Sequence, residues 1–540
     1  MDSRHRGNDR IKKLKTYKNI MSHSKFKNEP FTDFTDKKNK QAFEKALDKV
    51  TARFAKEYPV VIGGEKLWTD DKMHSINPSN EDMVLGTFQK ATAEMAVKAI
   101  ETAYETFHTW KNVAPKKRAE YLFKAAKIMR KRKHEFSAMM VYEVGKNWAE
   151  ADGDTAEAID FMEFYAREML RWSGDHPLVK LPDEKNHLEY LPLGVGAVIP
   201  PWNFPLAILV GMTTSAFVTG NTVVLKPSSD SPAIAQMFFE LLEEVKLPKG
   251  VVNFVTGGGG SIGDIMVQHH LTRFICFTGS MEVGLRINEL AAKAQPGQIW
   301  IKRVVAEMGG KDSIVVDKEL HSFNDAVKGT IQAAFGFQGQ KCSACSRVIV
   351  HADIYDKFCD ALSENVKTVK VDNAVNNPPM GPVINKRSQD NVLRYINKAV
   401  EEGGTIIAGG NKIEGKGYFV EPTIIKDVER NATISQEEIF GPVLAVLKAN
   451  DFDDAISIAN NTMFGLTGAI YTKNKKRLHK GAKEFFAGNL YLNRKCTGAL
   501  VGVHPFGGFN MSGTDSKAGG RDYLGLFMQA KLTSEKKIKK

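Results

Sequence analysis

Cys342 is the residue of this sequence best placed for nucleophilic chemistry. It closes a Gly-Gln-Lys-Cys motif at 339–342 and is followed by Ser-Ala-Cys-Ser-Arg at 343–347. A cysteine that follows such a turn and leads into a helix has its thiolate, the reactive form, stabilised by the helix terminus. Cys345 completes a Cys-x-x-Cys motif, but the chain offers neither a second ligand pair for zinc nor a thioredoxin-like surrounding. We therefore expect Cys345 to be a small buried residue.

Two acids in glycine-containing turns are further candidates for the same site. Glu307 begins Glu-Met-Gly-Gly-Lys at 307–311, directly before a predicted strand. A carboxylate beside a glycine pair can swing toward a neighbouring site and activate water, although taken alone such an acid is more often a solvated surface residue. Glu438 begins Glu-Ile-Phe-Gly-Pro at 438–442, where an acid near the ring of Phe440 suits a ribose and a flat ring.

Three loops that follow predicted strands carry residues that could hold a dinucleotide. The loop Pro-Pro-Trp-Asn-Phe-Pro at 200–205 pins the backbone with prolines and presents the amide of Asn203. Lys226 ends the next strand, where its ammonium could reach an adenosine hydroxyl or a phosphate. A glycine run at 257–263 opens a helix, so a pyrophosphate could approach backbone N–H groups at the positive helix end. A glycine run also fits a plain tight turn, and both interpretations stay open here.

Strands and helices alternate around these loops. Apolar positions at helical spacing predict helices over 38–60, 92–146 and 149–172. Further along, β-branched runs separated by helical segments occur at 196–199, 221–226, 251–255 and 273–277. A second α/β series begins near residue 313. This alternation indicates a parallel, doubly wound sheet, in which ligands bind at the carboxyl ends of the strands. Residues 178–193 resemble two extended runs about a polar turn, which predicts a projecting hairpin.

Net charge and composition narrow the function classes. The 540 residues are 42% apolar and 26% charged, which is ordinary for a globular enzyme and excludes a disordered chain. The net charge of +12 is concentrated in two tails, because residues 1–20 carry +5 and residues 531–540 carry +4. With no zinc-finger or RNA-binding motif present, this distribution argues against a nucleic-acid partner.

The most apolar stretch, 193–212, contains three prolines and an asparagine, so no membrane segment is expected. Five cysteines, an odd and sparse set, favour a reducing compartment, and we predict a cytoplasmic protein without a metal. Residues 1–20 lack the apolar core of a secretory signal. A dispensable leader, with Met21 as the natural start, is favoured over a transit peptide.

Five motifs occur in order along the chain, and together they resemble the aldehyde dehydrogenase superfamily over about residues 55–530. They lie at 201–205 (Pro-Trp-Asn-Phe-Pro), 277–280 (Phe-Thr-Gly-Ser), 307–311, 339–342 and 438–443. The segments 341–347 and 505–520 are most similar to the branch of stand-alone bacterial 1-pyrroline-5-carboxylate dehydrogenases. The resemblance implies a Rossmann-type doubly wound cofactor domain, an α/β catalytic domain and a protruding β-hairpin for oligomerisation.

The resemblance also divides the chain into four parts. These are a partly disordered N-terminal extension (1–37), an NAD-binding domain (38–173 and 194–306), an oligomerisation hairpin with the tail (174–193 and 515–540) and a catalytic domain (307–514).

Enzymes of that branch oxidise L-glutamate γ-semialdehyde to L-glutamate with NAD, in proline and arginine breakdown. The resemblance therefore implies a thiohemiacetal and then a thioester on Cys342, an oxyanion held by Asn203 and the Cys342 N–H, and hydrolysis by water that Glu307 activates. It assigns cofactor binding to Pro201, Trp202, Lys226, Ser229, Gly257, Gly279, Ser280, Glu438 and Phe440. It assigns the amino-acid end of the substrate to Ser343, Gly498, Ala499 and Phe506. Glu157 is a further substrate candidate, with a solvated helix acid as its alternative.

One departure from the family pattern bears on the cofactor. Many NAD-preferring members have an acid three residues after the strand-end lysine, and here that residue is Ser229. A serine does not repel a 2′-phosphate, so some NADP use stays open. The alternatives to the leading hypothesis are a dehydrogenase of another aldehyde such as succinate semialdehyde, a coenzyme-A-acylating relative and a catalytically silent member. Intact Cys342, Asn203 and Glu307 argue against the last two. The expected partners are a small aldehyde and further copies of the chain.

Overall fold

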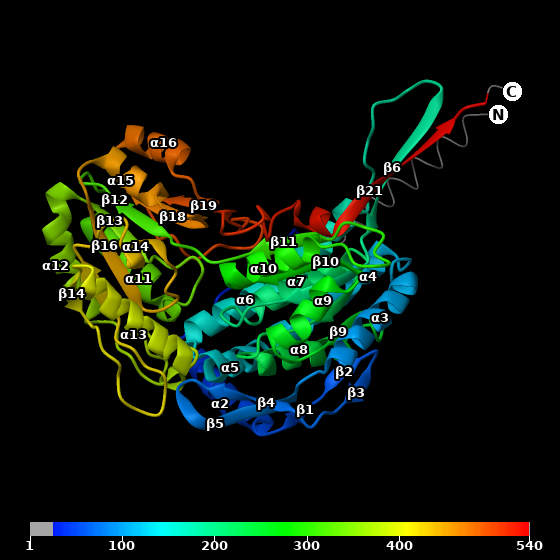
Figure 1. Cartoon of the computed structure of the whole chain (residues 1–540), viewed down its shortest axis with the longest axis horizontal. Helices are drawn as coiled ribbons and strands as arrows, with labels where there is room; N and C mark the ends of the chain where they lie inside the picture. The colour runs from blue at the N-terminus through cyan, green and yellow to red at the C-terminus, as the bar shows by residue number, and fades with distance from the viewer. Residues whose placement is uncertain (1–24, 539–540) are drawn as a thin grey trace.

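The computed structural model describes residues 25–538, which form two lobes, each built around a seven-stranded sheet (Figure 1). The first sheet has the order β11-β10-β7-β8-β9-β2-β3. Its strands are β2 (Val60–Ile62), β3 (Glu65–Leu67), β7 (Val195–Ile199), β8 (Thr222–Leu225), β9 (Val252–Phe254), β10 (Thr272–Thr278) and β11 (Arg303–Glu307). The strands β7 to β11 are parallel, and β2 joins β9 antiparallel. This arrangement confirms the predicted doubly wound sheet.

Helices connect these parallel strands. They are α7 (Ala207–Val218), α8 (Pro232–Glu244), α9 (Asp264–Gln268) and α10 (Met281–Ala292). Pro232 occupies the first turn of α8, where its missing N–H costs nothing. Because a parallel sheet is covered on both faces, its strands read as continuous apolar runs, as β8 does with four buried residues.

The second sheet has the order β14-β15-β16-β13-β12-β18-β19, with only β14 antiparallel. Its strands are β12 (Ser313–Val316), β13 (Arg347–His351), β14 (Thr405–Ala408), β15 (Thr423–Lys426), β16 (Val443–Ala449), β18 (Thr467–Tyr471) and β19 (Asn489–Leu492). The helices of this lobe are α11 (Phe323–Phe335), α12 (Tyr355–Val366), α13 (Lys386–Glu401), α14 (Thr433–Gln436), α15 (Phe452–Asn460) and α16 (Lys475–Glu484). The chain passes between the two sheets at 308–312. The exact division into domains stays a prediction.

Five more helices belong to this lobe. The helix α3 (Ala93–Trp110) packs on β8 and α9, while α4 (Pro115–Lys131), α5 (Lys133–Val144) and α6 (Trp148–Trp172) pack on α7 and α8, and α2 (Lys37–Val50) packs on α5. A small sheet of β1 (Glu57–Tyr58), β4 (Lys72–Asn77) and β5 (Asn80–Gln89) lies below these helices (Figure 1). The predicted helix over 38–60 ends earlier, at Val50. Ala55 adopts a left-handed φ of +56°, which a continuing helix excludes, and the chain then enters β1.

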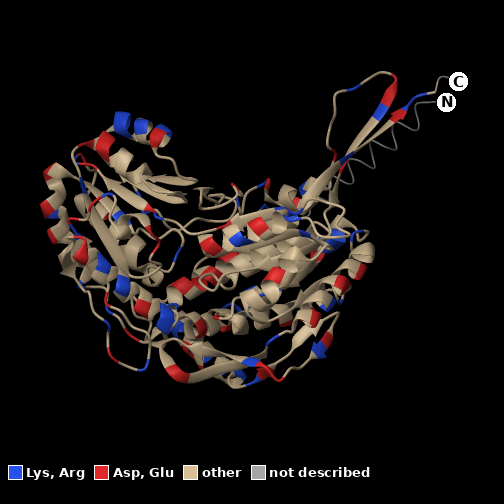
Figure 2. Cartoon of the chain, in the orientation of Figure 1, with Lys and Arg blue, Asp and Glu red and all other residues tan. Residues whose placement is uncertain are grey.

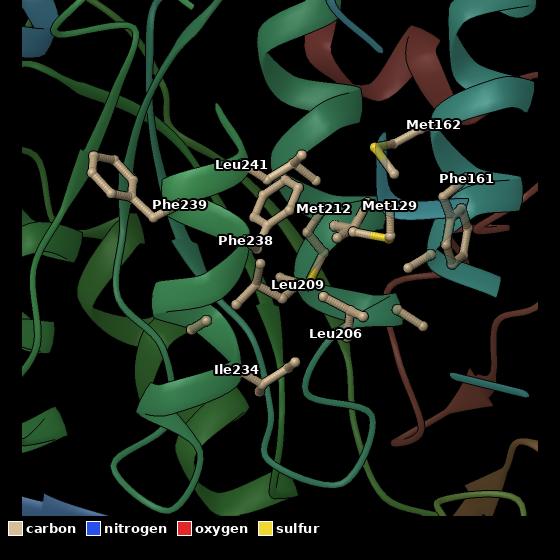
Figure 3. Packing of buried hydrophobic residues seen from close by; sticks show 14 of the residues in the cluster. Met129, Phe161, Met162, Leu206, Leu209, Met212, Ile234, Phe238, Phe239 and Leu241 are labelled. Carbon is tan, nitrogen blue, oxygen red and sulfur yellow. The ribbon is translucent and has the colours of Figure 1, made fainter. Parts of the chain in front are cut away.

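The core of this lobe lies between α6, α7 and α8. Phe238 of α8 faces Leu209 and Met212 of α7, while Phe161 and Met162 extend from α6 (Figure 3). All five side chains are buried. This packing fixes α7, and therefore the loop at 200–206 that leads into it.

The projecting element is real, but the predicted local hairpin at 178–193 is wrong. Only β6 (Glu184–Pro192) forms from that segment, and its antiparallel partner is β21 (Met528–Lys536) from the C-terminal end of the chain. The two strands extend away from the body as a ribbon (Figure 1). Residues 175–182 form no strand, and β6 pairs instead with β21 at nine positions from Met528 to Lys536.

Shorter elements complete the described part of the chain. They are β17 (Phe464–Gly465) paired with β20 (Phe509–Asn510), and tight helical turns at Thr51–Arg53, Gly259–Gly263, Gly336–Gly339, Ala352–Ile354, Ala374–Asn376 and Tyr523–Phe527. Lysine and arginine are interspersed with aspartate and glutamate over both lobes (Figure 2). Within residues 25–538, no helix is long and apolar enough to cross a membrane. The predicted leader at 1–20 lies outside the described residues.

Candidate active site

Cys342 lies in the turn that connects α11 to β13. Phe337 and Gln338, which precede it, both have left-handed backbone conformations, with φ of +50° and +58°. The predicted helix after Cys342 is absent, because the chain runs through an irregular turn directly into β13. Burial instead raises the pKa of the Cys342 thiol well above its usual value, and the charges of Asp312, Glu438 and Glu307 raise it further. The prediction that a helix terminus stabilises the thiolate is therefore wrong, and the nucleophile needs a base.

Asn203 lies beside this turn. It follows β7, and its side-chain amide donates a hydrogen bond to the carbonyl oxygen of Gln340 at 3.1 Å. The Gln340 side chain in turn accepts a hydrogen bond from the N–H of Ile384 at 2.9 Å. Both Asn203 and Gln340 are buried. The first lobe thus presents a fixed amide to the backbone two residues before the cysteine.

Glu307 ends β11, and its carboxyl group is held by the loop at 507–516. The N–H of Gly508 donates to its Oε2 at 3.0 Å, and the Ser516 hydroxyl donates to its Oε1. A Cβ at Gly507 would lie 1.5 Å from the carbonyl oxygen of Ser516 and 2.9 Å from Oε1, so glycine is needed there for these segments to meet. Burial raises the pKa of Glu307 to about 8, despite these two hydrogen bonds. A carboxyl group with such a pKa is suited to general acid–base catalysis near neutral pH.

The glycine pair after Glu307, Gly309 and Gly310, lets neighbouring segments pack closely against it. The N–H of Gly310 donates to Glu438 Oε1 at 3.0 Å, and a Cβ at Gly309 would lie only 2.1 Å from Glu438 Oε2. A Cβ at Gly310 would lie 2.4 Å from the carbonyl oxygen of Cys342. Burial raises the pKa of Glu438 to about 7. The two glycines therefore let the acid at 438 and the cysteine turn approach the same backbone.

Two aromatic residues assigned to the cofactor lie together. The rings of Trp202 and Phe440 have centroids 5.4 Å apart in an edge-to-face arrangement, and Trp202 also approaches Phe337 at 6.5 Å. Phe440 has a left-handed φ of +57°. Pro201, half-buried, precedes Trp202 in the same loop.

Lys226, Ser229 and Gly257 converge on one carbonyl group. The ammonium of Lys226 and the hydroxyl of Ser229 both donate to the carbonyl oxygen of Gly257, at 3.1 and 3.4 Å. Burial lowers the pKa of Lys226 to about 8. A Cβ at Gly259 or Gly260 would meet open space, so this part of the glycine run is unobstructed. The three residues lie where β8 and β9 end.

Gly279 and Ser280 link this edge of the sheet to Glu307. The N–H of Gly279 donates to the carbonyl oxygen of Glu307 at 3.1 Å, and the Ser280 hydroxyl caps α10 by accepting from Val283 N–H at 3.4 Å. The assigned loops thus follow β7, β8, β9 and β10 at one edge of the sheet. A buried lysine, open glycines and paired aromatic rings at that edge fit a dinucleotide.

The residues assigned to the substrate lie on the cysteine turn, at Ser343, and on one irregular stretch between β19 and β20. The Cys496 thiol donates to the carbonyl oxygen of Ser343 at 3.4 Å, which ties the loop at 494–500 to the residue after Cys342. Gly498 has a left-handed φ of +85°, and Arg494 donates to its carbonyl oxygen at 3.2 Å. Ala499 follows it. Phe506 exchanges two backbone hydrogen bonds with Ala518, and it stands two residues before the Gly508 that binds Glu307.

Glu157 lies on a charged stripe of α6 that sequence analysis missed. Glu150, Asp154 and Glu157 share one helix face at spacings of four and three residues. Asp154 pairs with Lys146 at 2.6 Å, and Glu150 pairs with Lys341 at 2.6 Å, directly beside Cys342. Glu157 is partly buried, and this burial raises its pKa to about 8, which supports the substrate hypothesis over a solvated acid without deciding between them. The stripe could have been found in the sequence, because three acids recur at helical spacing in a segment otherwise rich in alanine and aromatic residues.

The remaining cysteines are structural. Cys345 is buried and donates to the carbonyl oxygen of Arg347 at 3.2 Å, as expected of a small core residue. Across residues 25–538, no cluster of three or more His, Cys, Asp or Glu side chains could hold a metal ion.

Comparisons with known proteins agree with this geometry. The aldehyde dehydrogenase family model matches residues 68–533. A Bacillus cereus protein named 1-pyrroline-5-carboxylate dehydrogenase is 56% identical over 511 residues, covering 94% of this chain and 99% of that protein. A solved Thermus 1-pyrroline-5-carboxylate dehydrogenase with bound NAD has a TM-score of 0.94 and 46% identity, covering 95% of this chain and 100% of the other. Betaine aldehyde dehydrogenase from Staphylococcus aureus is more distant, at 28% identity and a TM-score of 0.85, covering 92% and 98%.

Proposed function

This chain belongs to the aldehyde dehydrogenase family, and we propose that it oxidises L-glutamate γ-semialdehyde to L-glutamate with NAD as hydride acceptor. The observation that carries the proposal is the convergence of three groups at one turn. Cys342 provides a thiol, Asn203 provides an amide bonded to the same turn, and the loop at 494–500 is tied to Ser343. The names of the Bacillus cereus relative and of the NAD-bound Thermus structure support this substrate and cofactor.

The reaction begins at Cys342. The Cys342 thiol loses its proton to solvent, and the thiolate sulfur forms a bond to the aldehyde carbon, so that the carbonyl oxygen becomes an oxyanion. The Asn203 amide carries two N–H donors, one of which is bonded to Gln340, and the other is available to the oxyanion. The Cys342 backbone N–H completes the oxyanion site.

NAD, when bound, accepts the hydride that leaves the thiohemiacetal carbon, and a thioester on Cys342 remains. Lys226, Ser229 and Gly257 would hold the adenosine end of the cofactor, and Trp202, Glu438 and Phe440 the nicotinamide end. Glu307 then takes a proton from water, the water oxygen bonds to the thioester carbon, and the Cys342 thiolate leaves. The product is the γ-carboxylate of glutamate.

The amino-acid end of the substrate is held by the neighbouring loops. The backbone N–H groups of Gly498 and Ala499 and the hydroxyl of Ser343 would donate to its carboxylate, and Phe506 would pack on its aliphatic middle. Glu157, on the stripe that includes Glu150, is a further candidate for contact with the substrate.

A turnover assay tests this function. Purified protein is mixed with NAD and either glutamate γ-semialdehyde or succinate semialdehyde, and NADH and the acid product are measured. We expect glutamate from the first substrate and much slower NADH formation from the second. Cys342→Ala should abolish NADH formation and leave NAD binding intact, while the matched control Cys345→Ala should keep most activity. Faster turnover of succinate semialdehyde, or an active Cys342→Ala protein, would contradict the proposal.

The ribbon of β6 and β21 is the proposed oligomerisation element. Its strands, with the segment leading into β6, expose Val179 at 95% and Leu532 at 59%, which supports burial against a second copy. Truncation after residue 527 should lower the number of chains per particle, as measured by sedimentation. An unchanged number of chains would exclude this role. The cytoplasmic location stays a prediction, supported by five free cysteines.

A further inference from the structure

An N-terminal strap, residues 25–36, lies across α6 and reaches the loop at 498–506. We propose that Asn28 of this strap is a positioning residue that holds the loop in the conformation that binds the amino-acid end of the substrate. The proposal rests on the proposed function for its substrate. It assigns a role in substrate positioning to a segment that precedes the first described helix.

The strap is fixed to α6 through two buried acids. The N–H of Glu29 donates to Asp160 Oδ1 at 2.7 Å. The N–H and hydroxyl of Thr32 both donate to Asp152, at 2.8 and 2.6 Å. Lys133 pairs with the same Asp152 at 2.9 Å and donates to the carbonyl oxygen of Pro30, also at 2.9 Å. Four hydrogen bonds to buried partners make this a docked segment with a defined register.

Asn28 connects that anchor to the loop. Its side-chain Nδ2 donates to Asp160 Oδ2 at 2.7 Å and to the carbonyl oxygen of Val501 at 3.0 Å. Val501 is two residues after Ala499 and five before Phe506, so the bond falls within the proposed substrate loop. One amide therefore bridges a buried carboxylate on a rigid helix and the middle of the loop.

An aromatic contact supports the same loop. Phe26 packs edge-to-face on Phe164 of α6, with centroids 5.2 Å apart. A Cβ at Gly502 would lie 3.1 Å from the Phe26 ring and 3.0 Å from the Phe164 ring, so the loop backbone rests on both rings. On its other side, Gly502 N–H donates to the carbonyl oxygen of Gly519 at 2.9 Å. The strap thus forms one of the two walls that hold the loop at 501–502.

The position of this loop matters more for binding than for chemistry. Its backbone N–H groups must meet the substrate carboxylate at a fixed distance from Cys342, and a loop that moves must be ordered on binding. Loss of the Asn28 bond should therefore raise KM for glutamate γ-semialdehyde. It should leave the rate of the chemical step unchanged. It should also leave NAD binding unchanged, because the proposed cofactor loops follow strands of the first sheet.

Steady-state kinetics of Asn28→Ala test this inference, with Thr35→Ala as the matched control. Thr35 lies on the same strap, and within residues 25–538 its side chain bonds only to Asp33, also in the strap. We expect Asn28→Ala to raise KM for glutamate γ-semialdehyde about fivefold, the equivalent of one net hydrogen bond. Its kcat, its KM for NAD and its kcat/KM for a simple aliphatic aldehyde should stay within about twofold of the wild-type values. Thr35→Ala should match the wild type throughout.

Hydrogen exchange provides a readout that does not depend on the substrate. Amides of residues 498–504 should exchange several-fold faster in Asn28→Ala than in Thr35→Ala, while those of α6 keep their protection. Unchanged exchange and unchanged KM would overturn the inference, as would an equal loss toward both aldehydes and NAD. If the wild type does not oxidise glutamate γ-semialdehyde, the proposed function fails. In that case faster exchange of the loop still supports its positioning by Asn28, and unchanged exchange overturns it.

Discussion

The side-chain amide of Asn203 donates to the carbonyl oxygen of Gln340 at 3.1 Å, two residues before Cys342. This bond crosses from the loop after β7 to the turn before β13, and so joins the two lobes at the proposed reaction centre. It leaves one amide N–H of Asn203 for a developing oxyanion.

Asn203→Ala should lower kcat by about 10²–10³-fold, because an oxyanion donor acts mainly in the transition state. The dissociation constant for NAD should stay near that of the wild type, as measured by calorimetry. Asn203→Asp, which has a similar shape but places an acceptor at the oxyanion, should be at least as slow. A loss of less than about tenfold in both variants would remove Asn203 from the oxyanion role.

The elevated pKa of Glu307 predicts how turnover depends on pH. Burial raises this pKa to about 8, and only the ionised carboxylate can take a proton from water. The steady-state rate should therefore rise with pH and level off above about 8, provided that hydrolysis limits turnover. In Glu307→Gln, the first turnover should still form one NADH per active site, and later turnovers should be slow.

Stopped-flow measurement of NADH separates these phases. The burst of NADH in Glu307→Gln should persist across the pH range. The rate of its slow phase should no longer increase with pH near pH 8. Wild-type steady-state turnover in the variant would exclude Glu307 as the base for hydrolysis.

Cofactor preference should respond to Ser229. Its hydroxyl shares the Gly257 carbonyl with Lys226, so residue 229 faces the same group as the proposed ribose-binding lysine. Ser229→Glu should lower NADP activity about tenfold or more relative to NAD activity, since like charges about 4 Å apart repel by ~1–4 kcal/mol. Ser229→Ala is the control without a charge. An equal effect of Ser229→Glu on both cofactors would mean that position 229 does not face the 2′-phosphate.

Stability should depend strongly on the ion pair between Lys146 and Asp154. Both side chains are fully buried, and Asp154 also accepts from the N–H of Ala207 at the start of α7. Lys146→Met leaves a buried acid unpaired and should lower the free energy of unfolding by ~3–5 kcal/mol in urea titrations. The control Lys293→Met breaks an exposed pair with Glu289 and should cost at most ~0.5 kcal/mol. Similar small losses in both variants would show that the buried pair does not stabilise α6 and α7.

The sequence predicted the strands of the first lobe well because buried parallel strands carry continuous apolar runs, as at 222–225 and 272–278. It failed for the ribbon, since β6 has the same pattern whether its partner is nearby or 336–352 residues away, and β21 lies at the far end of the chain. The prediction of a helix after Cys342 was wrong. Phe337 and Gln338 adopt left-handed conformations that direct the chain toward β13, and neither residue type indicates such a conformation.

The motifs alone singled out Cys342, Asn203 and Glu307 as candidates, and their roles stay proposals. The supporting contacts were not predictable, because they join distant segments. Ser516 binds Glu307, Cys496 binds the backbone of Ser343, and Asn28 binds Val501. Such pairs depend on the packing of whole elements rather than on local pattern.

The most direct test compares kcat/KM for glutamate γ-semialdehyde with that for an aliphatic aldehyde of similar length that lacks the charged end. The donors at Gly498, Ala499 and Ser343 would be left unpaired by the simple aldehyde, at about 1–3 kcal/mol each. We therefore expect the amino-acid aldehyde to be preferred by about two orders of magnitude or more, and Ser343→Ala to narrow this ratio by weakening that substrate alone. Comparable efficiency toward both aldehydes in the wild type would contradict the assignment to glutamate γ-semialdehyde.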